Sequence, residues 1–322
     1  MISIDQVSID AVERAARTIA GRVHRTPLQR SATLSELVGG DAFLKAELFQ
    51  RTGSFKARGA LNRLEELTGD ERVAGVISIS AGNHAQALAW AAREAGLDAL
   101  VVMWVGADAA KVAATKGYGA AVDQVAADPT EAFARLEELQ VETGRTLVHP
   151  FGDPAVIAGQ GTVGLEILED VAEPDVVVVP VGGGGLVSGI ATAVKAKRPG
   201  TRVVAVEPER STALHDALAA GRPVPVVPAS AADALNAPHT TELCLRICRE
   251  RGVESVLVSE DELFEAFRWL YARTKLAVEL GAAASTAALL SGKVRVEAGG
   301  TAVAVVSGGN VAPKQAAAIL AA

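Results

Sequence analysis

Lys56 is the residue whose surroundings point most directly to chemistry. It lies in the run 52–60, where Ser54 is a good helix N-cap and apolar residues then recur at helical spacing. Lys56 is therefore predicted in the first turn of an amphipathic helix. The positive N-terminal end of a helix dipole disfavours an ammonium and favours the neutral amine that attacks carbonyls. The alternative is an ordinary solvated surface lysine.

Four consecutive glycines form a second feature with chemical consequences. Gly182, Gly183, Gly184 and Gly185, followed by Leu186, come after four valines that predict a buried strand, and they open a predicted helix. Backbone N–H groups at such a turn can converge on a phosphate, and the helix N-terminus adds favourable potential. The spacing matches neither the dinucleotide fingerprint nor the Walker loop. A plain flexible turn is the alternative, but bare backbone is entropically costly, so we predict a phosphate cradle.

Two further loops gather polar groups after predicted strands. Residues 80–86 bring hydroxyl, amide and backbone donors to one helix N-terminus, where a carboxylate would be held well. A capping turn with a satisfied histidine is the competing interpretation. Residues 307–310, Ser-Gly-Gly-Asn, end the last predicted strand, and ligands collect beyond strand carboxyl ends in open α/β sheets.

Parallel sheets covered by helices are needed to position these loops. Apolar β-branched runs alternate with alanine-rich segments of helical period. They predict strands at 73–80, 99–105, 121–125 and 146–148, and then at 175–181, 201–206, 255–258 and 301–306. The fold class is therefore α/β, with open, mostly parallel sheets. The proline-rich segment 220–238 is predicted to be an extended surface loop.

The predicted domains are a large one formed by 1–74 and 149–322 and a small one formed by 75–148. The alternative is a single large unit, because 322 residues lie near two average domain lengths without excluding one. Two lobes that pack directly together leave a cleft between them, where binding sites tend to form.

Composition limits the partners of this chain. A formal net charge of −7 and a pI near 5.4 argue against a nucleic-acid partner and favour a small-molecule substrate. The N-terminus does not resemble a signal peptide, and the uncharged stretch 176–194 is broken by Pro180 and the glycines, so we expect it to be buried rather than in a membrane. Cys244 and Cys248 are expected to be reduced thiols on one helix, which fits a cytoplasmic location.

Together these loops resemble the fold-type II enzymes that depend on pyridoxal 5′-phosphate (PLP), a fold similar to that of the tryptophan synthase β subunit. The resemblance is to the serine/threonine dehydratase (threonine ammonia-lyase) group, which also includes serine racemase. It covers nearly the whole chain through five blocks in the family's order: 52–60, 80–86, 156–162, 182–186 and 307–311.

The resemblance implies roles for the matching positions. Lys56 would bond to the cofactor and later act as the base, with Phe55 packed on the pyridine ring. The cofactor phosphate would be held by Gly182, Gly183, Gly184, Gly185 and Leu186. Asn83 would bind the ring hydroxyl, Ser307 would face the ring nitrogen, and Glu279 would lie on the cofactor side. The substrate would be held by Ser80, Ala81, Gly82, Asn83 and His84, with Ser80 and His84 on its carboxylate.

The implied reaction is elimination of water and ammonia from L-threonine, L-serine or a related hydroxy amino acid, giving a 2-oxo acid. Alternatives are an amino-acid racemase or a 3-hydroxyaspartate dehydratase on the same scaffold, or a non-catalytic protein that binds a phosphorylated ligand. Racemases of this family carry a serine where this chain has Ala81, which favours elimination. Members of the family are usually homodimers or homotetramers.

Other positions depart from the family pattern. The family's cation ligand is matched by Glu207, but the acidic partner six residues on is replaced by Ala213. Glu279 is followed by Leu-Gly-Ala rather than Pro-Ser-Gly, and Gly152 stands where an acidic residue is frequent. Because these changes lie near the expected place of the substrate side chain, the preferred hydroxy amino acid is left open.

Overall fold

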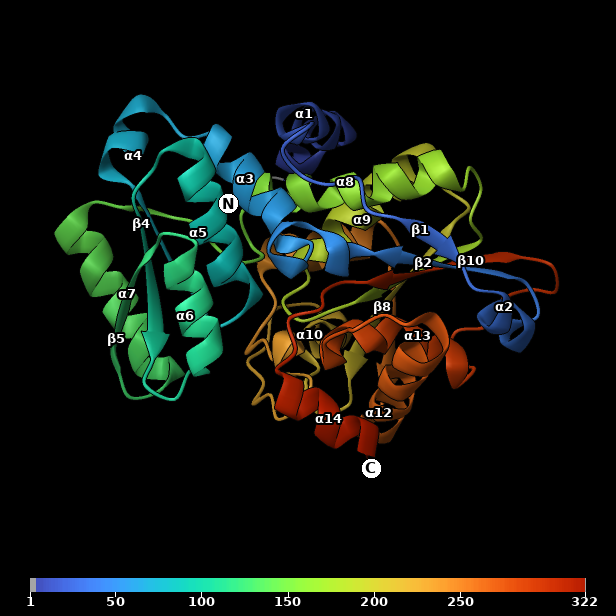
Figure 1. Cartoon of the computed structure of the whole chain (residues 1–322). Helices are drawn as coiled ribbons and strands as arrows, with labels where there is room; N and C mark the ends of the chain where they lie inside the picture. The colour runs from blue at the N-terminus through green and yellow to red at the C-terminus, as the bar shows by residue number, and fades with distance from the viewer. Residues whose placement is uncertain (1–3, 322) are drawn as a thin grey trace.

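The chain forms two sheets with helices around both, as the computed structural model in Figure 1 shows for residues 4–321. The larger sheet has the order β1-β2-β10-β7-β8-β9. Its strands are β1 (Leu28–Arg30), β2 (Asp41–Ala46), β10 (Thr301–Val306), β7 (Val176–Pro180), β8 (Arg202–Pro208) and β9 (Glu254–Val258). Neighbouring strands are parallel except β1, which pairs antiparallel with β2. The predicted α/β class is confirmed.

The smaller sheet is wholly parallel. Its order is β5-β4-β3-β6, formed by Ala121–Ala126, Ala99–Trp104, Val76–Ile79 and Thr146–Leu147. Figure 1 shows it at the left, flanked by α5 (Asn83–Ala95), α6 (Ala109–Gly117) and α7 (Pro129–Thr143). All eight predicted strands are therefore present, although the first begins at Val76 because α4 (Gly69–Ala74) occupies the preceding residues.

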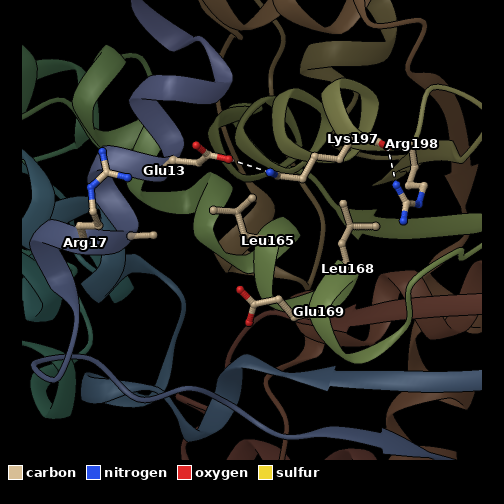
Figure 2. A pocket seen from close by; sticks show the side chains of 8 residues that line it. Glu13, Arg17, Leu165, Leu168, Glu169, Lys197 and Arg198 are labelled. Atoms are coloured by element: carbon tan, nitrogen blue, oxygen red, sulfur yellow. Dashed lines mark hydrogen bonds and ion pairs between the residues drawn. The ribbon is translucent and has the colours of Figure 1, made fainter.

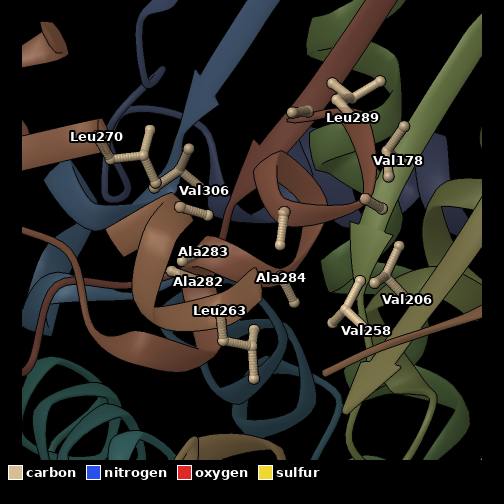
Figure 3. Packing of buried hydrophobic residues seen from close by; sticks show 14 of the residues in the cluster. Val178, Val206, Val258, Leu263, Leu270, Ala282, Ala283, Ala284, Leu289 and Val306 are labelled. Atoms are coloured by element: carbon tan, nitrogen blue, oxygen red, sulfur yellow. The ribbon is translucent and has the colours of Figure 1, made fainter. Parts of the chain in front are cut away.

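Helices cover both faces of the six-stranded sheet, and this explains its nearly continuous apolar strands. On one face Val176 and Val178 pack with residues of α12 (Glu260–Trp269) and α13 (Ala284–Leu290); Figure 3 shows this cluster around Val178, Leu263 and Leu289. On the other face Val177 and Val179 pack against α8 (Pro154–Asp170) and α9 (Gly185–Lys197).

The other regular elements are shorter or peripheral. They are the helices α1 (Ile9–Ile19), α2 (Ala32–Val38), α10 (Ala213–Ala220), α11 (Glu242–Glu250) and α14 (Pro313–Ala321), and the single turns η1 (Ile4–Val7), η2 (Glu47–Phe49), η3 (Arg51–Gly53), η4 (Asp233–Leu235), η5 (Leu270–Thr274) and η6 (Leu280–Ala283).

Three sequence predictions need comment. The strands β1 and β2 were not predicted. The stretch 176–194 is buried throughout, as expected, and among residues 4–321 no helix has the length and apolarity needed to cross a membrane. The segment 220–238 is irregular, but it is not wholly a surface loop, because Ala232 and Leu235 are buried and Leu235 lies against Gly182.

The helix that begins at Lys56, α3 (Lys56–Glu65), lies between α5 and α8 (Figure 1). Its apolar residues share a core with α5 and the smaller sheet, whereas its Gly59 lies against Gly159 of α8. A Cβ placed on Gly159 would come within 2.6 Å of the Gly59 Cα. The block 156–162 therefore lets two helices touch and so positions α3. The predicted domain bounds stay a prediction.

Replacing Gly159 with alanine should destabilise the fold through this contact. Because the added methyl would also lie 2.8 Å from the Arg58 carbonyl oxygen, backbone must move, and we expect the free energy of unfolding to fall by about 1–3 kcal/mol. Gly117→Ala in α6 is the matched control, since its Cβ meets nothing within 4 Å. Urea unfolding of both variants measures the difference, and equal midpoints would show that the helices do not require the contact.

Candidate active site

Lys56 is the first residue of α3, but the predicted cap is wrong. The N-cap position is Phe55, without a side-chain capping bond, while Ser54 is extended and its buried Oγ has no hydrogen-bond partner. The start of the helix is instead tied to the last strand, because the Phe55 N–H donates to the Ser307 carbonyl oxygen at 3.1 Å. Two of the predicted site residues are thereby neighbours.

The Lys56 amine is half-buried and donates to a single backbone acceptor. Its Nζ lies 2.7 Å from the Pro150 carbonyl oxygen and 5.2 Å from the centre of the Phe55 ring. Burial lowers the pKa of Lys56 from 10.5 to about 8, and the nearby Cys244 and Glu279 act in the opposite direction. The sequence indicated this direction through the helix dipole, whereas the structure identifies desolvation as the main cause.

The four glycines form the turn into α9. The helix begins at Gly185, and its N-cap, Gly184, has a left-handed φ of +96° and no side chain to cap the first N–H groups. Such groups have no intrahelical acceptor and favour an anion. At Gly183 a Cβ would come within 2.4 Å of the Phe151 ring, so close packing requires glycine there. The arrangement fits a phosphate held by backbone N–H groups.

The turn 149–152 connects the lysine with the glycine turn. Pro150 accepts from Lys56, and the next residue, Phe151, packs against Gly183. The Cys244 thiol donates to the Phe151 carbonyl oxygen at 3.3 Å, and His149 Nδ1 accepts from the Gly152 N–H at 2.8 Å. The sequence did not single out this link, because a backbone acceptor and a ring packed on a glycine leave no signal in residue type.

A second group of side chains lies at the other end of Lys56. Asn83 Nδ2 donates to both carboxyl oxygens of Glu279, at 2.8 and 3.0 Å, and Asn83 Oδ1 accepts from Asn310 Nδ2 at 2.8 Å. Burial raises the pKa of Glu279 to about 7. Asn310 also donates to the Thr52 carbonyl oxygen. Asn310, in a block recognised without a role, thus joins three of the predicted loops.

The loop before α5 has free backbone donors but a different use for its histidine. The helix N-cap is Gly82, without a side-chain cap, and Ser80 Oγ accepts from the Gly82 N–H at 3.2 Å. His84 is buried, and its Nε2 donates to the Val148 carbonyl oxygen at 3.1 Å. Burial lowers the pKa of His84 to about 3, so its ring is neutral. Its imidazole therefore offers no positive charge, and any hold on a carboxylate must come from backbone N–H groups.

Glu207 lies fully buried at the end of β8 and has backbone partners. Its two carboxyl oxygens accept from the N–H groups of Leu214 and His215, at 2.8 and 2.7 Å, at the start of α10. Burial raises the pKa of Glu207 to about 8. Nowhere in residues 4–321 do three or more His, Cys, Asp or Glu side chains gather as metal ligands. Glu207 thus caps α10, and the suggested cation remains a prediction.

A separate pocket of about 350 Å³ lies over α1, α8 and α9 (Figure 2). None of the predicted site residues lines it. Its Lys197 is paired with Glu13 at 2.6 Å, and Arg198 donates to backbone carbonyls. We therefore place the active site at Lys56 and the glycine turn.

Comparison with known proteins agrees with this geometry. The catabolic L-threonine dehydratase of Escherichia coli K12 is 41% identical over 307 residues, which cover 95% of this chain and 93% of that protein. A solved structure of threonine deaminase from the organism abbreviated T.th. superposes with a TM-score of 0.88 at 42% identity, covering 95% and 99% of the two chains. Maize serine racemase gives a TM-score of 0.91 at 36% identity, covering 95% and 94%.

The family profile described as pyridoxal-phosphate dependent enzyme matches residues 19–308, which include Lys56, the glycine turn and Ser307. The donors around these residues fit that cofactor, since they combine an amine of lowered pKa with an uncapped helix N-terminus suited to a phosphate. The chain therefore belongs to the pyridoxal-phosphate dependent enzymes of fold type II, and PLP is its cofactor.

Proposed function

We propose that this chain is an ammonia-lyase that converts L-threonine or L-serine to a 2-oxo acid and ammonia. The observation that carries the proposal is the Lys56 amine, held beside the glycine turn with a pKa lowered to about 8. The similarity to the E. coli dehydratase over 95% of the chain supports the substrate class. Threonine would yield 2-oxobutyrate, and serine would yield pyruvate, without net oxidation.

The residues of this chain have separate tasks in that reaction. Bound PLP supplies an aldehyde that bonds to amines and a ring that makes the substrate Cα proton acidic. We infer that the N–H groups of 182–186 hold the phosphate and that Phe55 packs on the ring. Asn83 lies where it could bind the ring hydroxyl, and Ser307 would offer the ring nitrogen a neutral hydroxyl. Glu279, hydrogen-bonded to Asn83, would fix that amide.

Lys56 Nζ would remove the Cα proton once the substrate amine has taken its place on the cofactor. A base with a pKa near the working pH is the most effective, and desolvation brings this lysine there. The backbone N–H groups at the start of α5, with Ser80, would hold the substrate carboxylate. Departure of the β-hydroxyl as water and hydrolysis of the product then release ammonia.

Two features narrow the substrate and the outcome. Burial lowers the pKa of His84 to about 3 and that of His149 to about 4, so both rings are neutral and neither would attract a second carboxylate. This favours threonine or serine over 3-hydroxyaspartate. Ala81 has a methyl group that cannot move a proton, which favours elimination over racemisation.

We also infer that the enzyme acts in the cytoplasm as a homodimer or homotetramer. Cys244 and Cys248 are buried free thiols, as expected for a reducing compartment. Exposed apolar side chains such as Phe49, Phe133 and Tyr271 offer surface for self-association. Light scattering of the purified protein measures the state directly.

Lys56→Ala should abolish turnover of every hydroxy amino acid. Loss of the base and of the bond to the cofactor should lower kcat by about 10²–10⁴-fold or more. Oxo-acid formation from L-threonine and L-serine is the assay, and Lys116→Ala, on the exposed side of α6, is the control that should retain activity. Undiminished turnover in the Lys56 variant would show that another group is the base.

Capture of PLP by the apoenzyme should depend on pH through Lys56. Only the neutral amine bonds to the aldehyde, so the rate should rise as the pH rises and level off above the pKa of Lys56, about 8. Stopped-flow absorbance follows the capture. A midpoint near 10.5, the ordinary lysine value, would show that burial does not tune this amine.

Ala81→Ser should add racemase activity. A hydroxyl at this half-exposed position would supply the proton donor that alanine lacks, so the ratio of D-serine to pyruvate formed from L-serine should increase. Chiral chromatography of the products measures the ratio against that of the unaltered enzyme. An unchanged ratio would mean that position 81 does not decide between the two reactions.

A further inference from the structure

Arg58 is fully buried two residues after Lys56, and all of its donors are used. Because successive helical residues turn by about 100°, its side chain leaves α3 on the side opposite Lys56. Nε lies 2.9 Å and Nη2 2.8 Å from the carboxyl oxygens of Glu47 in η2. Nη1 lies 2.6 Å and Nη2 2.9 Å from those of Glu166 in α8. Arg58 therefore binds two carboxylates from two other elements at once.

Arg58 belongs to a cluster of four buried or nearly buried charges. Lys45 of β2, also fully buried, donates to Glu166 at 2.6 Å and to the Thr26 carbonyl oxygen at 2.8 Å. Two cations thus balance two carboxylates. Removing four charges from water is expensive, and well-packed apolar residues would often be as stable or more so. Stability alone is therefore a poor reason for such a cluster, and geometric precision is a better one.

The start of α3 depends on this cluster for its place. The helix has no side-chain cap, and its first turn is otherwise tied by the bond from Phe55 to Ser307. Arg58 adds rigid contacts to η2 on one side and to α8 on the other. If the first turn slid or rotated, Lys56 Nζ would leave the Pro150 carbonyl oxygen and the neighbourhood of the glycine turn.

We propose that Arg58 is a positioning residue for Lys56, which holds the first turn of α3 through its simultaneous ion pairs with Glu47 and Glu166. The inference rests on the proposed role of Lys56 as the reacting amine. Arg58 itself touches neither substrate nor cofactor. Its effect is to keep the amine at the cradle and away from water.

Arg58→Lys tests the proposal while keeping the charge. An ammonium cannot reproduce the planar fork that serves two carboxylates, so the first turn should loosen. A small misplacement of a reacting group should lower kcat by about 10- to 100-fold. The KM for L-threonine should change by less than about threefold, because the substrate carboxylate would be held by α5 and not α3.

The second measurement uses the apoenzyme and does not depend on turnover. A looser first turn admits water to Lys56, so its pKa should rise, and the midpoint of PLP capture should move to a higher pH than in the unaltered protein. Glu166→Gln is a milder second variant, since the amide retains one acceptor oxygen. It should show the same two effects to a smaller degree, and it decides the question if the Arg58 variant does not fold.

Arg63→Lys is the matched control. Arg63 lies on the same helix and also joins it to the start of α8, through Asp153 at 2.8 Å, but it is further from Lys56. It should affect unfolding without moving kcat or the capture midpoint. If the Arg58 and Glu166 variants change only the unfolding midpoint, as Arg63→Lys does, the positioning role is overturned. Lys56→Ala remaining active would overturn the proposed function instead.

Discussion

The arrangement depends on one amine held out of water with a single backbone acceptor. Lys56 Nζ donates to the Pro150 carbonyl oxygen, and burial brings its pKa to about 8. An amine in this state is ready both to bond to an aldehyde and to accept a proton. Because the next residue, Phe151, packs on Gly183, the same turn sets the distance between the amine and the phosphate cradle.

Much of this architecture could be predicted from residue pattern. The β-branched runs identified the two sheets, since strands buried on both faces must be apolar throughout. The glycine turn at 182–185 was recognisable because bare backbone before a helix has few uses besides anion binding. The loops containing Lys56, Asn83 and Ser307 were expected to meet, and hydrogen bonds join them.

Other features depend on contacts that no local pattern records. Ser54 has the residue type of a cap, yet an isolated bridge pairs it with Gly308 and holds it extended. His84 was expected to hold a carboxylate, but its ring instead donates a hydrogen bond to a carbonyl 64 residues away in sequence. The short strands β1 and β2 are recognisable only from their pairing. Arg58 resembles any helical arginine until its two distant carboxylates are seen.

The most direct test is to find which residue bonds to the cofactor. Borohydride makes a bond between PLP and a protein amine permanent, and peptide mass spectrometry then locates it. The structure predicts the label on Lys56 alone, in the peptide that opens α3. A label on another lysine, or none on a PLP-saturated protein, would contradict the claim that this amine is the reacting group.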